Sequence, residues 1–341
     1  MFLEAETSFG LNFLSTLPAN QSIVFSPLSI ALALSLVHAG AKGSSRDQIG
    51  DVLLKGASDD QFISHFQFIS ESLKEGVNEV KVNVANRVYL QPKFLDFSTP
   101  SAVQKINSFV ETSTNGQITE MVTQESIKDA VALLVNAIYF KGRWEDNFAS
   151  SDTREREFHK DSGEKVKIPF TNEIKYHRDL AQDELFQVLV LRYKDPKYRF
   201  AIFLPKVRNG LGEAMKQLDA ARFQKLMNSA KSTYLNTAFP LFTADFETPL
   251  KDSLTKLGIS QIFTDNADLS GIAKKLKISD GAHKAMLEVT EDGTTAAAYT
   301  VVKAVPISMP MNDPIDFKAD HPFLYALVRE NHPLFLGVFR L

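Results

Sequence analysis

Residues 129–144, DAVALLVNAIYFKGRW, limit the possible folds more than any other stretch of the sequence. A run this apolar, with few polar interruptions, is typical of a strand that is buried on both faces in the middle of a sheet. Such a strand needs a neighbouring strand on each side and a packed layer over each face. The sequence therefore predicts a large sheet with this segment at its centre.

Helices and strands are mixed along the chain without a regular strand-helix repeat. Residues 26–43, SPLSIALALSLVHAGAKG, predict a buried helix, whereas residues 80–90, VKVNVANRVYL, alternate as a strand does. Short strands are predicted to dominate residues 155–205. This order favours an α+β fold in which antiparallel sheets pack with helices, rather than a doubly wound fold. No stretch resembles a linker, so residues 1–341 are expected to form a single domain, for which the 44% hydrophobic content is sufficient.

Charge and composition exclude several classes of partner. The formal net charge of −3 gives no field that would favour nucleic acid or an anionic membrane. The absence of cysteine excludes disulfides, a thiol nucleophile and a Cys-rich zinc site, and fits a reducing compartment. No run of 18 apolar residues predicts a membrane span. Glu4 and Glu6 lie where a signal peptide needs positive charge, so we expect a cytoplasmic protein, or an extracellular one if the N-terminus has been trimmed.

Motifs of enzymes and metal sites are missing from the sequence. There is no GxSxG or HExxH motif, and residues 39–45, AGAKGSS, lack the spacing of a phosphate-binding loop. The histidines lack paired ligand spacing, and structural roles are expected for them: His38, His65, His159, His177, His283, His321 and His332. We therefore expect no enzyme, no catalytic residue, no metal ion and no cofactor.

Residues 291–310, EDGTTAAAYTVVKAVPISMP, combine two kinds of signal. Small or apolar residues recur with a period of two, as in a strand buried on one face: Thr294, Ala296, Ala298, Thr300, Val302 and Ala304. Gly293 opens the stretch while Pro306 and Pro310 close it, which is typical of exposed turns. The segment is therefore interpreted as one that occupies both an exposed and a buried position.

Several collinear motifs resemble those of one family. HKAMLEVTEDGTTAAAYT, followed by FKADHPFLYAL and PLFLGVF, resembles the hinge, reactive loop and C-terminal signature of a serpin. FSPLSIALALSLVHAGAKG resembles the serpin shutter helix, LLVNAIYFKGRWEDNF the central strand with its breach tryptophan, and FETPLKDSLTKLGI with ADLSGI the segment ahead of the hinge. The resemblance covers nearly the whole chain. It implies the serpin fold, with a large mixed sheet, additional antiparallel sheets, surrounding helices and an exposed reactive loop at about residues 291–312.

The resemblance implies a suicide-substrate inhibitor of serine proteases. In serpins the protease cuts the reactive loop, and the hinge then inserts as a new strand of the large sheet and carries the acyl-linked protease with it. The expected partner is a serine protease held in a covalent acyl complex, with papain-like cysteine proteases as a second class of target. Matching to the family implies these hinge residues: Glu291, Gly293, Thr294, Ala296, Ala297, Ala298 and Thr300.

Matching also assigns residues that control opening of the sheet. Ser26, Ser29, Asn136 and His283 correspond to the polar shutter, and Trp144 corresponds to the breach where insertion starts. On the residues alone, His283 is a satisfied core histidine or a hydrogen-bond latch ahead of the inserting segment.

The position of the cleaved bond follows from the usual hinge length. Counting from Glu291 places it between Ile307 and Ser308, with Met309 and Val305 as the alternatives for the residue before the bond. Isoleucine suits a shallow hydrophobic pocket of the elastase type, whereas Met309 would favour chymotrypsin-like enzymes.

One region departs from the family. After residue 94 a helix and an edge strand of the large sheet are missing, a shortfall of roughly twenty residues and far more than ordinary loop variation. The alternative function is therefore a non-inhibitory carrier, chaperone or storage protein in which the missing strand has impaired insertion. Acidic residues in 58–80 disfavour heparin binding. A monomer is expected, with loop-sheet polymers as the alternative.

Overall fold

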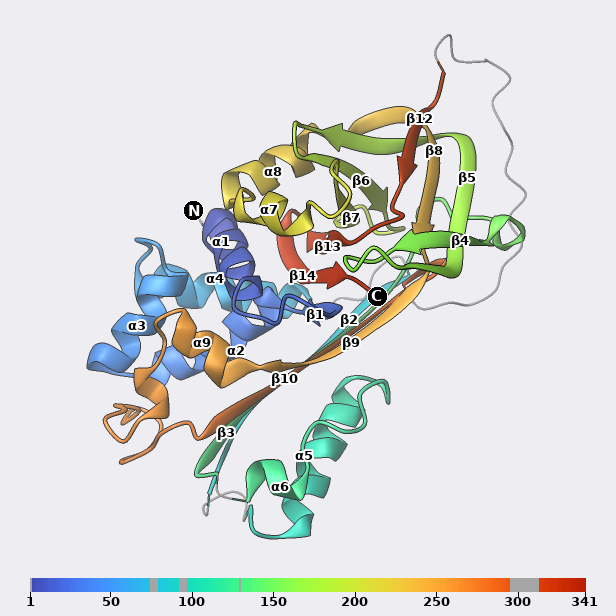
Figure 1. Ribbon diagram of the computed structural model, residues 1–341. Helices are drawn as coiled ribbons and strands as arrows, with labels where there is room; N and C mark the ends of the chain where they lie inside the picture. Colours follow the sequence, from blue (N-terminus) through green and yellow to red (C-terminus); the bar gives the residue numbers. More distant parts are fainter. Residues whose placement is uncertain (1, 74–78, 92–96, 129, 295–312) are drawn as a thin grey trace.

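The computed structural model describes residues 2–73, 79–91, 97–128, 130–294 and 313–341 (Figure 1). Its α-helices are α1 (Phe2–Leu14), α2 (Pro27–Gly40), α3 (Gly43–Leu53), α4 (Asp59–Ser72), α5 (Pro100–Ser113), α6 (Gln124–Ile127), α7 (Leu211–Lys216), α8 (Ala220–Ser229) and α9 (Leu250–Lys256). Two short 3₁₀ helices are η1 (Ser150–Asp152) and η2 (Gln261–Phe263). Among the helices described, none combines the length and apolar character needed to cross a membrane.

The strands form two sheets. They are β1 (Ile23–Phe25), β2 (Val80–Leu90), β3 (Ala132–Arg143), β4 (Arg154–His159), β5 (Lys165–Gln182), β6 (Phe186–Arg192), β7 (Tyr198–Pro205), β8 (Lys231–Pro240), β9 (Phe242–Pro249), β10 (Asp280–Val289), β11 (Gly293–Thr294), β12 (Ile315–Lys318), β13 (Phe323–Arg329) and β14 (His332–Phe339). The predicted α+β class is confirmed.

The nine-stranded sheet is antiparallel except for one pair of strands. Its order is β1-β14-β13-β7-β6-β5-β8-β12, with β4 paired to β5, and only β8 and β12 run parallel. Helices α7 and α8 lie beside this sheet at the top of Figure 1. Consecutive strands β5, β6 and β7 pair as neighbours, which is typical of short antiparallel connections. This sheet confirms the additional antiparallel strands predicted from the sequence.

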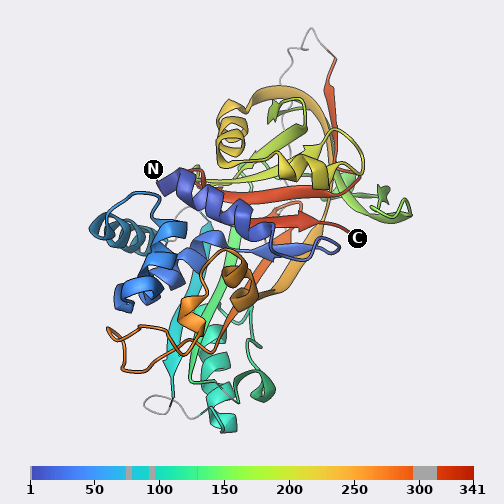
Figure 2. The same cartoon turned by 60° about the vertical axis from the view of Figure 1, so that its left-hand side comes forward.

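The five-stranded sheet is mixed, as predicted for the large sheet. β3 pairs with β2 antiparallel and with β10 parallel, β10 pairs with β9 antiparallel, and β11 pairs with the end of β3. Figures 1 and 2 show α5 and α6 on one face of this sheet, and α2 with α3, α4 and α9 on the side of the other face. The sheet therefore lies between two helical layers.

β3 is buried on both faces, which confirms the central strand predicted from its apolar run. Leu133 and Val135 belong to a hydrophobic core with Ile106 of α5. Leu134 and Ile138, which point the opposite way along the strand, belong to the main core that contains α2. A strand covered in this manner gains from apolar residues at every position, and this explains its lack of polar alternation.

β2 forms one edge of the five-stranded sheet. It pairs with β3 along its whole length, from Val80 opposite Gly142 to Leu90 opposite Ala132, and with no other strand that the structure describes. Only residues 91–99 separate β2 from α5. This short connection agrees with the expectation that a helix and an edge strand are missing after residue 94. The exposed side chains of Lys81 and Arg87 place charge along this strand, which discourages pairing with other chains.

β5 differs from the short strands predicted over residues 155–205. It is one continuous strand from Lys165 to Gln182. The irregularity in its middle is a β-bulge and not a loop. The pairing with β8 shifts register between Glu173 and Tyr176, and Lys175 has a φ of 56°. A bulge bends a strand without ending it, so β5 curves and reaches β4, β6 and β8.

Candidate functional site

A buried hydrogen-bonded cluster joins three strands of the five-stranded sheet. His283 of β10 lies opposite Asn136 of β3, and Asn136 lies opposite Asn86 of β2. The Asn136 side chain accepts a hydrogen bond from His283 Nδ1 and donates through Nδ2 to Asn86 Oδ1. Asn136 and His283 are fully buried, so these bonds form away from water, where leaving them unmade is costly.

The start of α2 completes this cluster. Ser26 caps the helix and accepts a hydrogen bond from the Ser29 N–H at 3.1 Å, while Pro27 occupies the first turn. The Ser26 N–H donates to His283 Nε2 at 3.1 Å, and Asn136 Nδ2 donates to Ser29 Oγ at 2.7 Å. The polar cluster, defined as Ser26, Ser29, Asn86, Asn136 and His283, thus ties α2 to the sheet.

The His283 imidazole is neutral in this arrangement. Burial lowers its pKa to about 3, and the hydrogen bond with Asn136 opposes this shift only in part. The hydrogen bonds agree, because Nε2 accepts from Ser26 and the proton is therefore on Nδ1, which faces Asn136 Oδ1. Of the two interpretations of His283 from the sequence, the geometry matches a satisfied core histidine that also links β10 to β3.

Trp144 anchors the segment that follows β10. The indole is fully buried and stacks on Tyr193 with ring centroids 4.5 Å apart. Trp144 Nε1 donates to the Thr290 carbonyl at 2.9 Å, and its backbone N–H donates to the Asp292 carbonyl at 3.0 Å. Glu291 accepts a hydrogen bond from Thr153 Oγ1 at 2.6 Å. Residues 290–292 are thereby held against the end of β3.

β11 begins a strand along β3. Thr294 lies opposite Gly142, and Gly293 lies opposite Arg143, antiparallel to β3. Thr294 is fully buried, and its hydroxyl is 2.7 Å from the Tyr193 hydroxyl. Gly293 has a φ of +148°, and a Cβ there would lie 2.1 Å from the Gly142 carbonyl oxygen. Only glycine fits this close approach of two backbones.

β10 and β11 pair with the same edge of β3. β2 occupies the other edge from Ala132 to Gly142, so β11 pairs on the β10 side of Gly142. Farther along β3, β10 pairs directly with residues 133–139. If the chain continued beyond Thr294 in the direction of β11, it would pass between β3 and β10 and would separate them.

The structure brings the assigned residues into two groups and leaves others undescribed. The polar cluster lies in the middle of the β3 and β10 pairing, and Trp144, Glu291, Gly293 and Thr294 lie at its end. The remaining assignments lie outside the described residues: Ala296, Ala297, Ala298, Thr300, Val305, Ile307, Ser308 and Met309.

Sequence reasoning did not identify Asn86 or Tyr193 as part of these groups. Asn86 is a polar residue in an alternating strand, and only its register against Asn136 shows its role in the cluster. Tyr193, which directly follows the end of β6, contacts Trp144 and Thr294 across a large distance in the sequence. The fold also gathers Glu6, His65 and His332, although the spacing of the histidines gave no sign of a cluster.

The whole chain matches one family model. Residues 4–340 match the model described as serpin (serine protease inhibitor). Iripin-2 of Ixodes ricinus is 31% identical, with 98% of this chain and 92% of that protein covered. Alpha-1-antitrypsin 1-2 of Mus musculus is 32% identical, with 93% of this chain and 82% of that protein covered.

Solved structures agree with the sequence relatives. The native state of the thermophilic serpin tengpin has a TM-score of 0.88 and 25% identity, with 100% of this chain and 94% of that chain covered. Uncleaved ovalbumin has a TM-score of 0.89 and 25% identity over 99% of both chains. Thyroxine-binding globulin in complex with thyroxine has a TM-score of 0.85 and 27% identity, with 98% of each chain covered.

Replacement of Gly293 by alanine is expected to release β11 from β3, because the new Cβ collides with the Gly142 carbonyl. Trp144 is the one tryptophan of the chain, so its fluorescence reports on this region alone. We expect a red-shifted emission spectrum in Gly293→Ala as the indole becomes hydrated. Gly212→Ala is the control, since nothing lies within 4 Å of the added Cβ. Identical emission from Gly293→Ala and the parent would contradict the tight pairing.

Acidification is expected to destabilise the protein through His283. The folded state holds this imidazole neutral down to a pKa of about 3, whereas the unfolded chain takes up a proton near the ordinary value of 6.5. The unfolded state therefore binds more protons between these values, and the free energy of unfolding falls as the pH falls, by at most about 1.4 kcal/mol per pH unit from this group.

The measurement compares the pH dependence of urea unfolding in the parent and in His283→Gln. The variant is less stable near pH 7, and we expect the difference to shrink as the pH falls from 6.5 to 4. His177→Gln, which removes an exposed histidine, controls for the loss of an imidazole elsewhere. Parallel curves for the parent and His283→Gln would show that the buried imidazole does not govern acid stability.

Proposed function

Because this chain belongs to the serpin family, we propose that it is a suicide-substrate inhibitor of serine proteases that traps its target by inserting its cleaved loop between β3 and β10. Homologues named as antitrypsin and antiproteinase support an inhibitory activity. The family consists mostly of inhibitors and not of enzymes, in line with the lack of a catalytic motif in the sequence.

The pairing of β11 with β3 is the observation that carries the proposal. Gly293 and Thr294 already occupy the first positions of a strand antiparallel to β3, on the edge that β10 uses farther along. In the sequence, the small residues continue with a period of two from Thr294 to Ala304. The face that would enter the sheet is therefore free of bulk and charge over the length that insertion requires.

The polar cluster is proposed to act as the shutter of this sheet. Insertion separates β10 from β3, so it must break the hydrogen bond between His283 and Asn136. Both groups are fully buried, and the barrier to opening rises by the cost of leaving them unpaired. The cluster would thus hold the sheet closed until the cut loop supplies a replacement strand.

The trapping step is acyl transfer without hydrolysis. The protease serine Oγ attacks the carbonyl carbon of Ile307, the bond to the Ser308 nitrogen breaks, and the Ser308 amine leaves with a proton. The inhibitor remains joined to the protease by an ester. Insertion would then carry this ester away from the cleavage position before water attacks it.

Ile307 sets the expected class of target. A β-branched apolar side chain suits a shallow hydrophobic pocket, as in elastase-like enzymes. Trypsin-like pockets contain a buried acid that isoleucine would leave unpaired, at a cost of a few kcal/mol. Lys303 lies four residues before Ile307, and cleavage there would leave a shorter segment for insertion.

A second candidate function rests on the edge position of β2. Among the strands that the structure describes, none lies outside β2, so the balance between the closed and the inserted form would differ from that of a serpin with a complete sheet. If closure is favoured too strongly, the loop is cut without trapping, and the protein would serve as a carrier, chaperone or storage protein. The structural relative that holds thyroxine is a precedent for a ligand in this fold.

Incubation with elastase-like and chymotrypsin-like proteases tests the proposal. We expect a complex with the elastase-like enzyme that survives boiling in detergent, because an ester joins the two chains. Mass spectrometry of the released C-terminal peptide then locates the cleaved bond. A peptide that begins at Ser308 supports Ile307, whereas one that begins at Pro310 assigns cleavage after Met309 and points to chymotrypsin-like targets.

The same reaction separates the two candidate functions. Insertion adds a strand paired on both edges and is expected to raise the thermal midpoint of the cleaved protein sharply. Cleavage without a detergent-stable complex, together with an unchanged thermal midpoint, would overturn the inhibitory proposal and favour the non-inhibitory one.

Ala298→Arg is expected to convert the inhibitor into a substrate. In the sequence, Ala298 belongs to the small face that is proposed to enter the sheet, where an unpaired buried arginine would cost several kcal/mol. An increase of about 1.4 kcal/mol in the insertion barrier slows insertion tenfold, whereas the rate of ester hydrolysis does not change. The stoichiometry of inhibition, measured by titration of active protease, should therefore rise steeply.

The matched control is Ala297→Arg, which makes the same substitution at the neighbouring position of the chain. In the alternating pattern of the sequence this side chain belongs to the outward face, where a charge costs little. Equal stoichiometries for Ala298→Arg, Ala297→Arg and the parent would show that Ala298 does not have to enter the sheet.

A further inference from the structure

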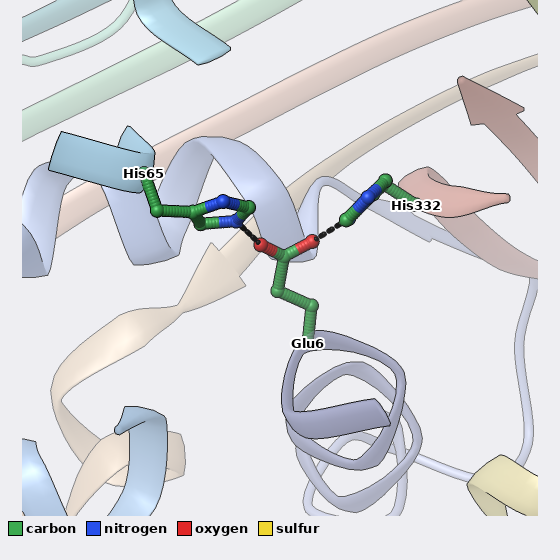
Figure 3. Close-up of side chains that lie close together, drawn as sticks. All are labelled: Glu6, His65 and His332. Atoms are coloured by element: carbon green, nitrogen blue, oxygen red, sulfur yellow. Dashed lines mark hydrogen bonds and ion pairs between the residues drawn. The ribbon is translucent and has the colours of Figure 1, made fainter. Parts of the chain in front are cut away.

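A buried carboxylate lies between two imidazoles at a distance from the inhibitory machinery. Glu6 of α1 accepts a hydrogen bond from His65 of α4, with Oε1 and Nε2 2.5 Å apart. Its other oxygen, Oε2, is 2.5 Å from Nδ1 of His332 in β14. Figure 3 shows the carboxylate pointing into the space between the two rings. Three segments that are far apart in the sequence thus meet at one carboxyl group.

The donor atoms of this group are close enough to share one ion. The ligand atoms of Glu6, His65 and His332 all lie within 4.8 Å of one another. In a tetrahedral zinc site with bonds of about 2.0 to 2.2 Å, neighbouring donor atoms are roughly 3.3 to 3.6 Å apart. The two contacts of 2.5 Å between carboxylate oxygen and imidazole nitrogen would have to widen by about 1 Å, with release of the protons they share, to reach this spacing.

The charge of Glu6 suits a cation. The carboxylate is buried, and each of its oxygens lies 2.5 Å from an imidazole nitrogen. Among the described residues, no lysine or arginine forms an ion pair with this carboxylate. The partners of this buried acid are imidazoles and not the permanently charged side chains of lysine or arginine. Its negative charge can therefore be compensated by a metal ion.

The cluster is held in shape and is open to solvent on one side. The Phe2 ring stacks on His65 with centroids 4.2 Å apart and an interplanar angle of 10°, which restricts rotation of that imidazole. The Glu6 side chain is only 4% exposed, whereas the side chains of His65 and His332 are 18% and 23% exposed. The partly exposed imidazoles would give an ion access to the cluster from solvent.

We propose that Glu6, His65 and His332 form a binding site for a divalent transition metal ion of the zinc class, with water in the fourth position. Two imidazole nitrogens and one carboxylate are a ligand set that zinc favours in open sites. Magnesium and calcium take mostly oxygen ligands and do not match this set. The ion would tie the N-terminal helix α1 to α4 and to the C-terminal hairpin of β13 and β14. This inference does not rest on the proposed inhibitory function.

Cobalt(II) titration of the full chain, after treatment with a chelator, tests the site without any variant. Cobalt substitutes for zinc, and its visible absorption is intense in tetrahedral sites and weak in octahedral ones. We expect an intense band that saturates at one equivalent and disappears when zinc is added. A weak octahedral spectrum, or no saturation, would overturn the proposal.

Variants then locate the site, with zinc binding measured by calorimetry. His65→Gln and His332→Gln should each weaken zinc binding by at least about tenfold, the loss expected when a residue that supports a metal site is replaced. His177→Gln is the matched control, since it removes an exposed histidine from a different part of the fold. Circular dichroism of each variant in chelator establishes that it is folded.

Thermal unfolding supplies an independent measurement. Zinc that binds the folded state should raise the thermal midpoint of the parent and of His177→Gln, but not that of the double variant His65→Gln, His332→Gln. Magnesium at the same concentration should have no effect on any of the proteins. Zinc binding of equal strength in the parent and the double variant would place the ion elsewhere and would overturn the proposal.

Discussion

The hydrogen bonds between β3 and β10 are the interaction on which the rest of this structure depends. The two strands pair in parallel from Leu133 opposite Asp280 to Tyr139 opposite Met286, with Asn136 and His283 at the middle of the pairing. A strand that enters between them replaces one ladder by two, so insertion gains backbone pairing only after the existing ladder has been broken. In the proposed mechanism this cost is a barrier that keeps the sheet closed, and the buried polar cluster would raise that barrier, since apolar side chains would slide apart more easily.

In the proposed mechanism, the end of this pairing would determine where opening begins. Beyond Tyr139, β10 no longer pairs with β3, and Gly293 and Thr294 occupy that edge instead. If β11 were extended by one residue at a time, it would displace β10 one pair at a time, and the cost would be distributed over many small steps. Trp144 holds residues 290–292 with two hydrogen bonds, which fixes the start of β11 against β3. In the proposed mechanism, the register alone would then make insertion start at this end.

Sequence patterns predicted the parts of the fold that depend on neighbours along the chain. The central position of β3 followed from its apolar run, and the bounds of β2 followed from its alternation, because burial of each face decides both patterns. The small face that starts at Thr294 is predicted from the same kind of alternation. The role of Asn86 depends on register between strands, and the meeting of Glu6 with two histidines depends on packing of α1 against α4 and β14. Neither arrangement produces a periodic pattern in the sequence. The length of β5 is not predicted either, because in a sequence a bulge resembles the end of a strand.

The edge position of β2 bears on which parts would move if the sheet opened. β2, β3 and α5 share one hydrophobic core, to which Ala85, Val135 and Ile106 belong, so these elements could move as one unit. Ala282 and Met286 of β10 also pack against this core, and these contacts cross the line along which β3 and β10 separate. Opening would therefore break the polar cluster on one face of the sheet and the packing of Met286 on the other. Since no described strand pairs with the outer side of β2, no strand pairing would be lost at that edge, and resistance would come from the boundary between β3 and β10 and from the contact of Leu134 and Ile138 with the main core.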